Sequence, residues 1–380
     1  MKQERRKICY LSGTRADFGL VKVTLDAIVK SEFLSLDLLV TGMHLSDQFG
    51  NTVNEIKEAG FNIAKCIPVD IEVTTGSSMA KNIAKTLEGC ISALEQIKPD
   101  ILILLGDRGE MLAGAIAAIH LNIPIVHIHG GERSGTVDEP VRHAISKLSH
   151  YHFVSTLEAR ERLVRMGEPE GNVFVTGAPG LDNLDSLITF DRNSLFQELD
   201  LDINKPVALM VFHPVLQEAN IAGDATIRIL NVLIEKNVQV VALKPNSDAG
   251  SHNIKKVLED FESRNLIRVV THFSREKFVS WMSIADLMIG NSSAGIIEAA
   301  SLGTPVINIG VRQNLRERNK NIIDVGLESA DIDKAINVAL TSGRFKIGNI
   351  YGDGNTAEKI VVLLNKLSLD SKVLYKINAY

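Results

Sequence analysis

The stretch of residues 101–142 constrains the fold most, because it holds two apolar runs that each end in polar residues. Residues 101–105 are apolar throughout, as in a strand that is buried on both faces of a parallel sheet. Small residues at 111–121 then predict a helix, and residues 124–128 predict a second buried strand. A strand, a helix and a strand in this order form a βαβ unit, and such units predict a parallel sheet.

The same alternation of strands and helices continues along the chain. In the first half we expect strands at 7–11, 36–40, 63–67, 152–155 and 173–175, and helices ending near residue 30, near 51–59, at 78–98 and at 157–166. Turn residues at 176–182 interrupt the pattern. In the second half we expect strands at 207–212, 238–243, 267–270, 287–289 and 305–309, and helices at 221–235, 254–263, 275–284, 294–302, 331–341 and 356–367.

This pattern predicts an α/β protein with two doubly wound, Rossmann-like domains that face each other across a central cleft. We place the boundary in the turn segment, which gives an N-terminal domain of residues 1–178 and a C-terminal domain of residues 179–380. The last helix is expected to pack back on the N-terminal domain. A length of 380 residues suits two domains of ordinary size.

The composition is that of a soluble globular protein, with 45% hydrophobic and 23% charged residues. The net charge of −5 gives no support to nucleic-acid binding, and no apolar run approaches the length that spans a bilayer. Cys9, Cys66 and Cys90 are odd in number and lack a CxxC spacing, so we interpret them as small buried thiols in a reducing cytosol. The expected location is the cytoplasm, with no nucleic-acid or membrane partner.

Acidic side chains gather where the two opening strands end. Asp107 follows the first strand, and Glu132 and Asp138 follow the second. Because parallel α/β sheets bind their ligands beyond the carboxyl ends of the strands, these carboxylates are candidates for proton transfer. An alternative interpretation makes them N-caps of the helices that follow, above all Asp138, which stands shortly before Pro140.

Two histidines belong to the same region. His127 and His129 stand two residues apart on the second strand, so the alternation places them on the same side. With Asp107 or Glu132 they could hold a metal ion, but no further ligand has a characteristic spacing. We therefore expect no metal, and we interpret the acids and histidines together as a proton-transfer site.

The loops expected to bind a nucleotide lack the G-x-G-x-x-G pattern of Rossmann dehydrogenases. The first loop carries Arg15 instead, whose guanidinium suits a phosphate and equally a surface ion pair. Residues 290–295 join a strand to a helix, so Ser292, Ser293 and nearby N–H groups can hold a diphosphate as well as cap the helix. One turn later, Glu298 can accept hydrogen bonds from ribose hydroxyls or act as a partner of the helix dipole.

Two further strand ends of the second half carry polar residues toward the same cleft. His213 follows the strand at 207–212, and Asn246 follows the strand at 238–243. A lone histidine is more often structural than functional, but a position at the carboxyl end of a parallel strand favours a functional role. We expect Asn246 to contact the nucleotide.

Taken together, the ordered motifs resemble the hydrolysing UDP-N-acetylglucosamine 2-epimerases of sialic-acid biosynthesis over nearly the whole chain. The motifs are Ser-Gly-Thr-Arg-Ala-Asp at 12–17, Val-Thr-Gly-Met-His at 40–44, Gly-Asp-Arg at 106–108, His-Ile-His-Gly-Gly-Glu at 127–132, Arg-His-Ala-Ile-Ser-Lys-Leu at 142–148, Phe-His-Pro at 212–214 and Gly-Asn-Ser-Ser-Ala-Gly at 290–295. The resemblance implies a GT-B fold, in which two Rossmann-like domains face a cleft and the C-terminal one holds most of the UDP. It implies no metal or redox cofactor.

Residue roles carried over from the family follow the matching motifs. Asp107 and Asp138 resemble catalytic acids. Many members carry Glu where this chain has His129, whereas others carry His, and some of these act on a 2,4-diacetamido sugar nucleotide. We therefore add Glu132, the nearest substitute, together with His129 and His213 to the candidate catalytic groups. The residues that resemble UDP contacts are Arg15, Arg108, His213, Asn246, Phe273, Ser292, Ser293, Glu298 and Arg312.

The reaction implied by the resemblance converts UDP-N-acetylglucosamine and water to N-acetylmannosamine and UDP, by elimination to a glycal and hydration. Its main competitor is the same chemistry on a UDP-2,4-diacetamido-trideoxy sugar of a legionaminic-type pathway. The fold and the nucleotide motifs also fit a non-hydrolysing 2-epimerase, a GT-B glycosyltransferase, a UDP-binding regulatory module and a metal-dependent hydrolase. The expected partners are the UDP-sugar substrate and further copies of the chain, in a homodimer or homotetramer.

Overall fold

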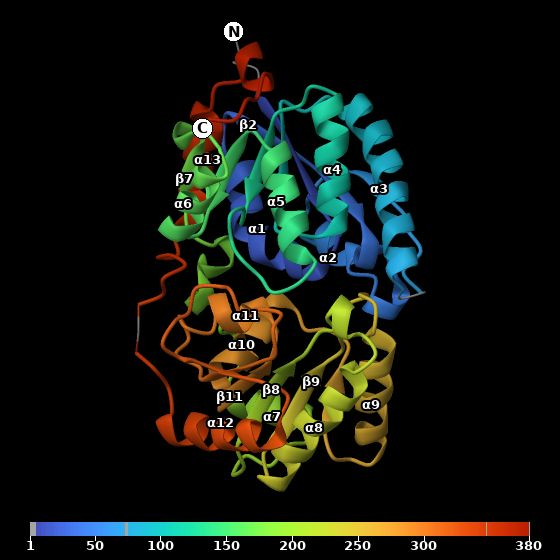
Figure 1. Cartoon of the computed structure of the whole chain (residues 1–380), viewed down its shortest axis with the longest axis vertical. Coiled ribbons are helices and arrows are strands. Elements are labelled where there is room, and N and C mark those ends of the chain that lie inside the picture. Colours follow the sequence, from blue (N-terminus) through green and yellow to red (C-terminus); the bar gives the residue numbers. More distant parts are fainter. Residues whose placement is uncertain (1–4, 73–74, 347, 380) are drawn as a thin grey trace.

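The computed structural model describes residues 5–72, 75–346 and 348–379. Its two domains lie one above the other, and each contains a parallel sheet with helices on both faces (Figure 1). Within these described residues, no helix is long and apolar enough to cross a membrane. The prediction of two doubly wound α/β domains is confirmed.

The N-terminal domain is built on a seven-stranded sheet with the order β3-β2-β1-β4-β5-β6-β7. The strand order reverses between β1 and β4, which makes this place the topological switch point where α/β sheets bind ligands. The strands are β1 (Arg6–Ser12), β2 (Leu34–Thr41), β3 (Ile63–Ile67), β4 (Ile101–Leu105), β5 (Ile125–Ile128), β6 (Tyr151–Val154) and β7 (Val173–Val175).

Helices bury both faces of this sheet, which explains why β4 is apolar at every position. Ile101, Ile103 and Leu105 face one core, whereas Leu102 and Leu104 face the other. The first core also contains α1 (Arg15–Lys30), α2 (Val53–Glu58) and α13 (Thr356–Lys366). The second contains α3 (Gly76–Ile97), α4 (Gly109–His120) and α5 (Asp138–Leu148), while α6 (Leu157–Arg165) packs on β6 and β7.

The C-terminal domain repeats the arrangement with a six-stranded sheet of order β10-β9-β8-β11-β12-β13. Its switch point lies between β8 and β11. The strands are β8 (Val207–Val211), β9 (Gln239–Leu243), β10 (Arg268–Val270), β11 (Leu287–Gly290), β12 (Val306–Ile309) and β13 (Ile322–Val325). One face packs on α8 (Ala222–Glu235), α9 (Ser251–Ser263) and α12 (Ser329–Ser342), and the other on α7 (Arg192–Glu198), α10 (Arg275–Ile284) and α11 (Ser293–Ile297).

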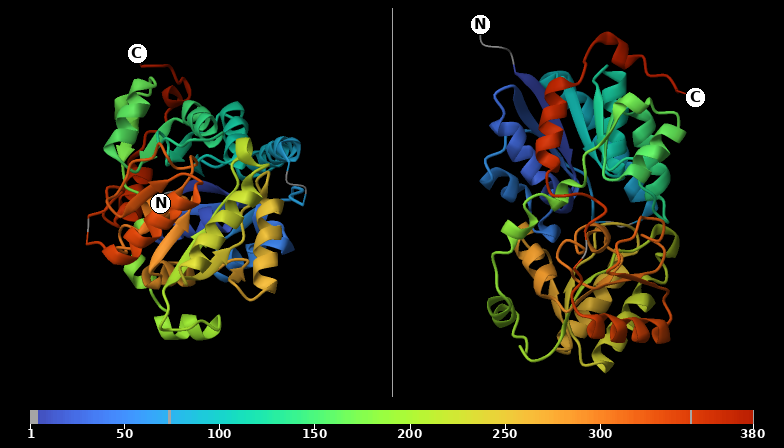
Figure 2. Two further views of the ribbon diagram at one scale, coloured as in Figure 1. Left: turned by 60° about the horizontal axis from the view of Figure 1, so that its bottom comes forward. Right: turned by 90° about the vertical axis from the view of Figure 1, so that its left-hand side faces the viewer.

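The two segments that connect the domains lie side by side. The Ala178 N–H donates to the Tyr351 carbonyl oxygen at 2.8 Å. The Asp182 carboxylate accepts the Thr356 N–H at 2.8 Å, which caps the start of α13. Beyond this point α13 lies against α1 in the upper domain (Figure 2, right). We keep residues 1–178 and 179–380 as the proposed division of the chain.

Three elements of the C-terminal domain differ from the prediction. The helix expected at 294–302 ends at Ile297, because the carbonyl oxygens of Ile296 and Ile297 accept hydrogen bonds from the side chains of Asn319 and Asn349. In addition, β13 and α7 are not predicted from the sequence. β13 is a four-residue edge strand of partly exposed residues in which Asp324 interrupts the apolar residues, so it does not stand out in the sequence as a buried strand.

The interpretation of the cysteines is wrong for one of the three. Cys9 and Cys90 are buried, but Cys66 is exposed. It lies on β3, which is the edge strand of the first sheet and is open on much of its length.

Candidate active site

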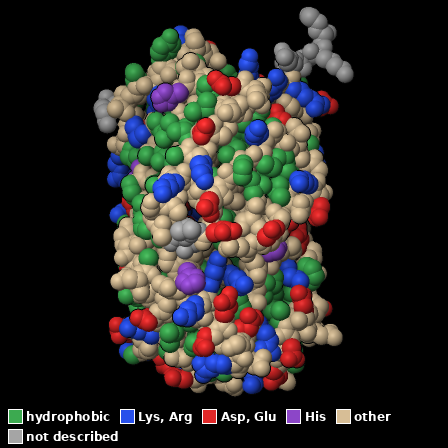
Figure 3. Space-filling view, turned by 90° about the vertical axis from the view of Figure 1, so that its right-hand side faces the viewer, with side chains coloured by type: hydrophobic (Ala, Val, Ile, Leu, Met, Phe, Trp, Pro, Cys, Tyr) green, Lys and Arg blue, Asp and Glu red, His purple; other side chains and the backbone are tan. Residues whose placement is uncertain are grey.

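Charged side chains of both domains meet where the two switch points face each other. Figure 3 shows acidic and basic side chains together around the middle of the face that carries α3 and α9. The ion pairs across the boundary include Arg108–Asp248 at 3.6 Å, Arg312–Asp138 at 3.7 Å and Arg316–Glu132. The candidate site therefore takes groups from both domains.

Asp107 directly follows β4 and is held by a buried arginine. Its carboxylate pairs with Arg142 on α5, whose side chain is only 1% exposed, whereas Asp107 itself is 22% exposed. Arg142 also donates to the backbone oxygen of Glu132 at 3.2 Å. The guanidinium thus fixes the carboxylate of Asp107 and the loop after β5 relative to each other.

Asp138 is the first residue of α5 and lies across the domain boundary from Arg312. Its side chain is 28% exposed. The N-cap of α5 is Val137, and the N-cap of α4 is Arg108, so neither Asp138 nor Asp107 is a helix cap. The alternative interpretation as caps is therefore wrong, and both acids remain candidates for proton transfer.

His129 and Glu132 form a buried network just after β5. The Nδ1 atom of His129 is bonded to Oε1 of Glu132, and the Ser155 hydroxyl lies 2.8 Å from both atoms. Oε2 of Glu132 pairs with Arg316 from the other domain. Burial raises the pKa of Glu132, but Arg316 and His129 outweigh it and lower the pKa to about 2. Both carboxylate oxygens are thus engaged, which does not favour the direct proton transfer predicted for Glu132.

His127 has different partners and does not form a pair with His129. Its Nε2–H donates to the Gly106 carbonyl oxygen at 2.7 Å, and its Nδ1 accepts from the Ser146 hydroxyl at 3.0 Å. Burial lowers its pKa to about 3, so the ring is neutral at physiological pH. Among the residues that the structure describes, no group of three or more His, Cys, Asp or Glu is arranged to hold a metal ion.

The loop after β11 passes close to β8 because it begins with a glycine. Gly290 has a φ of 135°, and a Cβ there would collide with the Val211 carbonyl oxygen of β8. The side chain of Asn291 then bridges the two loops, accepting the His213 N–H and donating to the His213 carbonyl oxygen, both at 2.8 Å. Ser292 caps α11 as expected, which leaves Ser293 at the first helical position.

His213 and Arg312 lie together beside this loop. Burial and, secondly, the charge of Arg312 lower the pKa of His213 to about 3. The His213 Nδ1 accepts the Asn246 N–H at 3.3 Å, so the neutral ring carries its proton on Nε2. Arg312 donates to the Asn291 carbonyl oxygen at 3.1 Å. These groups offer N–H donors at one place, which suits a phosphate.

Arg15 is the first residue of α1 and is only partly satisfied. Its Nε lies 3.2 Å from the Glu55 carboxylate. Its Nη2 is buried and has no hydrogen-bond partner among the described residues. A buried donor without an acceptor costs free energy, so this atom suits an anionic ligand. Arg108, the N-cap of α4, pairs with Glu110 at 3.3 Å as well as with Asp248.

Two residues that resemble UDP contacts are buried instead of open. The Phe273 side chain is in the core of the C-terminal domain, 6.1 Å from the Trp281 ring and stacked on it. Glu298 is 2% exposed and pairs with Arg275, which also donates to the Gly180 carbonyl oxygen at 2.8 Å. The structure thus brings His213, Arg312 and Arg108 close to the loop of Ser292 and Ser293. Arg15 pairs with Glu55 instead, and the Phe273 ring lies in the core.

The arginines that hold the acids were not predicted from the sequence. Arg142 stands in the motif at 142–148, to which no role was assigned, and Arg316 lies in the arginine-rich segment 312–318 after β12. The rule that locates ligands beyond the carboxyl ends of strands points to that segment as well. The pairing of Arg316 with Glu132 spans 184 residues and has no local signal.

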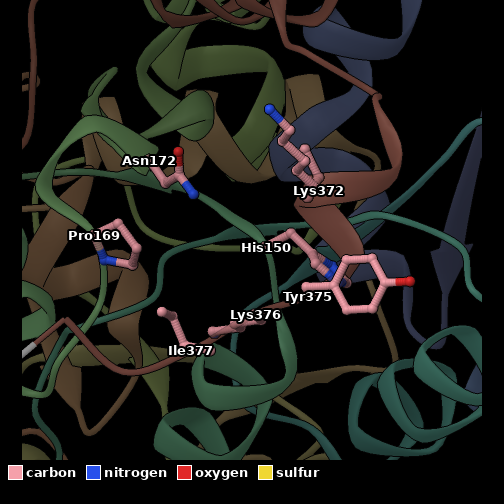
Figure 4. Close-up of a pocket in the computed structure, with 8 residues that line it drawn as sticks. His150, Pro169, Asn172, Lys372, Tyr375, Lys376 and Ile377 are labelled. Atoms are coloured by element: carbon pink, nitrogen blue, oxygen red, sulfur yellow. The ribbon is translucent and has the colours of Figure 1, made fainter.

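A separate pocket of about 140 Å³ lies elsewhere on the N-terminal domain (Figure 4). It is lined by His150 and by the C-terminal residues Lys372, Tyr375 and Lys376, among others. His150 precedes β6, whereas the candidate catalytic residues follow their strands. The pocket is therefore at the opposite end of the sheet, and we give it no part in the reaction.

Two Rossmann-like domains that face each other, each with a parallel sheet, define the GT-B-like fold class. The crystal structure of the Methanocaldococcus jannaschii UDP-GlcNAc 2-epimerase in complex with UDP-GlcNAc and UDP matches with a TM-score of 0.80. The match covers 95% of this chain and 99% of that chain at 21% identity, and it confirms the GT-B-like fold.

Sequence comparisons identify the family. The model of the family described as UDP-N-acetylglucosamine 2-epimerase matches residues 26–365. The chain belongs to this family, and the resemblance to its hydrolysing members is confirmed. It is 48% identical to the Legionella pneumophila UDP-N,N'-diacetylbacillosamine 2-epimerase (hydrolyzing), over 99% of this chain and 100% of the relative. It is 36% identical to the Campylobacter jejuni GDP/UDP-N,N'-diacetylbacillosamine 2-epimerase (hydrolyzing), over 90% of this chain and 89% of the relative.

Proposed function

We propose that the protein is a hydrolysing 2-epimerase that acts on a UDP-2,4-diacetamido-trideoxy sugar of the N,N'-diacetylbacillosamine type. The observation that carries the proposal is the 48% identity, over nearly the full length of both chains, to a relative named for this activity. This substrate takes the place of UDP-N-acetylglucosamine, the first expectation from the sequence, and the reaction class is unchanged. The products are UDP and the sugar inverted at carbon 2.

The reaction has two halves, and both need proton transfer. In the first, a base takes the proton from carbon 2 of the sugar while the bond between carbon 1 and the UDP oxygen breaks, which leaves a glycal. In the second, water adds its hydroxyl to carbon 1, and a proton is delivered to the opposite face of carbon 2. Because that C–H is weakly acidic, stabilisation of the departing UDP contributes much of the rate.

In this proposal the C-terminal domain holds most of the nucleotide. In the C-terminal domain the Nε2–H of His213, beside the loop of Ser292 and Ser293, is a donor suited to the diphosphate. The unpartnered Nη2 of Arg15 is the donor proposed from the N-terminal domain. Arg108, Arg312, Asn246 and Glu298 complete the proposed UDP contacts. The Phe273 ring is stacked on Trp281 in the core, so we propose no contact from this side chain to UDP. Asp107 and Asp138 are the proposed proton-transfer acids, joined by His129.

The proposal is tested with purified protein, heavy water and two substrates. Proton NMR should show release of UDP from the UDP-2,4-diacetamido sugar, deuterium at carbon 2 and the epimerised product. The kcat/KM for this substrate should exceed that for UDP-N-acetylglucosamine by at least about tenfold, the usual size of one well-made polar contact of about 1.4 kcal/mol. A higher kcat/KM for UDP-N-acetylglucosamine would refute the substrate, and transfer of the sugar to an acceptor would refute the reaction.

A further inference from the structure

The backbone at His129 is held in a conformation that a residue with a Cβ rarely adopts. Its φ is 63°, in the left-handed region, directly after β5 ends. Its N–H donates to the Phe153 carbonyl oxygen at 3.1 Å, and its ring is bonded to Glu132 and Ser155. Backbone strain of this kind persists only where the surroundings fix it, and such places cluster at functional sites.

Glu132 is placed to decide where the proton on the His129 ring lies. Its side chain is 3% exposed, and the permanent charge of Arg316 on Oε2 keeps the carboxylate ionised. An ionised carboxylate only accepts hydrogen bonds, so the Nδ1 atom that faces Oε1 must be the donor. The Ser155 hydroxyl donates to the same oxygen at 2.8 Å and supports this arrangement.

The second ring nitrogen of His129 is the one left for chemistry. In the part of the chain that the structure describes, no residue forms a hydrogen bond with Nε2 of His129. The titratable and charged groups of this network include Glu132, Arg316, His127 and, through Glu132, Arg142 and Tyr351. His127 is neutral and fully engaged with Gly106 and Ser146. With the proton of the neutral ring on Nδ1, Nε2 carries the lone pair that can accept a second proton.

We infer that Glu132 is a positioning residue that fixes the tautomer of His129, and that Nε2 of His129 takes a proton from carbon 2 of the sugar. This inference rests on the proposed function. When Nε2 takes the proton, the C–H electron pair forms the glycal double bond, the electrons of the broken carbon 1–oxygen bond leave with UDP, and Glu132 stabilises the imidazolium. In the hydration half, the hydroxyl of water adds to carbon 1, a proton reaches carbon 2 from the opposite face, and the imidazolium releases its proton to solvent. The transfer on the opposite face is left to an aspartate.

Glu132→Gln tests the inference, because the amide can keep Arg316 on its oxygen while its N–H₂ donates to Nδ1. That exchange forces the ring proton onto Nε2 and removes the lone pair. In a serine protease the equivalent change costs about 10⁴ in kcat, so we expect a loss of kcat of roughly 10²–10⁴ and the loss of the histidine limb from the pH profile of kcat. The matched control is Glu168→Gln, since Glu168 forms a buried pair with His152 at 2.8 Å away from the cleft; its pH profile should match that of the wild type.

A double-mutant cycle separates a positioning role from a direct one. If Glu132 acts through His129, Glu132→Gln should slow the His129→Ala enzyme by less than about threefold. An equal loss in both backgrounds, or a single Glu132→Gln variant within about threefold of wild type with an unchanged pH profile, would overturn the inference.

A measurement without substrate keeps the test independent of activity and of variant folding. Nitrogen-15 NMR of the histidine rings in the wild-type protein should show His129 protonated on Nδ1 in its neutral form. A neutral ring protonated on Nε2 would overturn the inference whatever the substrate. If the ring has the expected tautomer but the protein turns over neither UDP-sugar, the proposed function is refuted, and with it the catalytic role of His129.

Discussion

Replacing Asp107 by Asn should affect both catalysis and stability, because the carboxylate is the counter-charge of a buried arginine. The variant loses the negative charge but keeps an oxygen that accepts from Arg142. Removing one partner of a buried ion pair typically costs about 3–5 kcal/mol; since Asp107 is 22% exposed and Asn still accepts a hydrogen bond, we expect about 2–3 kcal/mol. In a domain of this size, that corresponds to a melting temperature lower by roughly 4–12 °C.

Asp138→Asn is the matched comparison. Asp138 is 28% exposed and 3.7 Å from Arg312, so the loss of its charge should cost less than about 1 kcal/mol. Both variants should abolish product formation, measured as UDP release, while only Asp107→Asn melts clearly earlier in calorimetry. From the sequence alone, both would be expected to melt near the wild type.

A second substitution checks that the cost comes from Arg142. In the double variant Asp107→Asn/Arg142→Met both charges are gone, so stability should recover toward the wild-type value while activity stays absent. Equal melting temperatures for the two Asn variants, or no recovery in the double variant, would show that the Asp107–Arg142 pair is not what stabilises this part of the domain. Turnover of either Asn variant within about tenfold of wild type would refute its role in proton transfer.

Further predictions concern pH, the nucleotide and metals. Burial lowers the pKa of His127 from 6.5 to about 3, so the stability that its neutral ring provides is complete above pH 6.5 and is lost as the pH falls toward 3. The loss is at most about 1.4 kcal/mol per pH unit. The free energy of unfolding in urea, measured at pH 7, 6 and 5, should therefore fall less steeply for His127→Gln than for the wild type. Ser293→Ala should weaken UDP binding in calorimetry without changing the melting temperature. Glu298→Ala should lower both the affinity for UDP and the melting temperature, because it leaves Arg275 buried without its counter-charge. Turnover should survive excess EDTA; activity that is lost and then restored by zinc or manganese would revive a metal-dependent reaction.

The periodicity of the chain made most of the fold predictable. Strands such as β4 are buried on both faces, so their apolar runs stand out against helices with a polar side. β13 could not be found in this way, because it is a short edge strand of partly exposed residues that Asp324 interrupts. The early end of α11 was also hidden, since Asn319 and Asn349 reach its carbonyl oxygens from distant loops.

The candidate site was predictable only as far as single strand ends. Asp107 and His213 could be located because each lies two residues after the end of a strand at a switch point. No local pattern indicates that Arg142 holds Asp107, or that Arg316 engages Glu132. Those pairings depend on how helices and domains pack, which is a property of the whole fold.

The ion pairs across the domain boundary differ in burial, and this difference separates their roles. In the Arg108–Asp248 and Arg312–Asp138 pairs the side chains are 16–28% exposed, and the charged groups lie 3.6 and 3.7 Å apart. Pairs of this kind contribute little to stability, so the phosphates of an incoming nucleotide can compete for their guanidinium groups at small cost. The Arg316–Glu132 pair is 7% and 3% exposed, and separating it would leave two charges in a site that excludes water. Nucleotide binding can therefore exchange the partners of Arg108 and Arg312 while the network around His129 stays assembled.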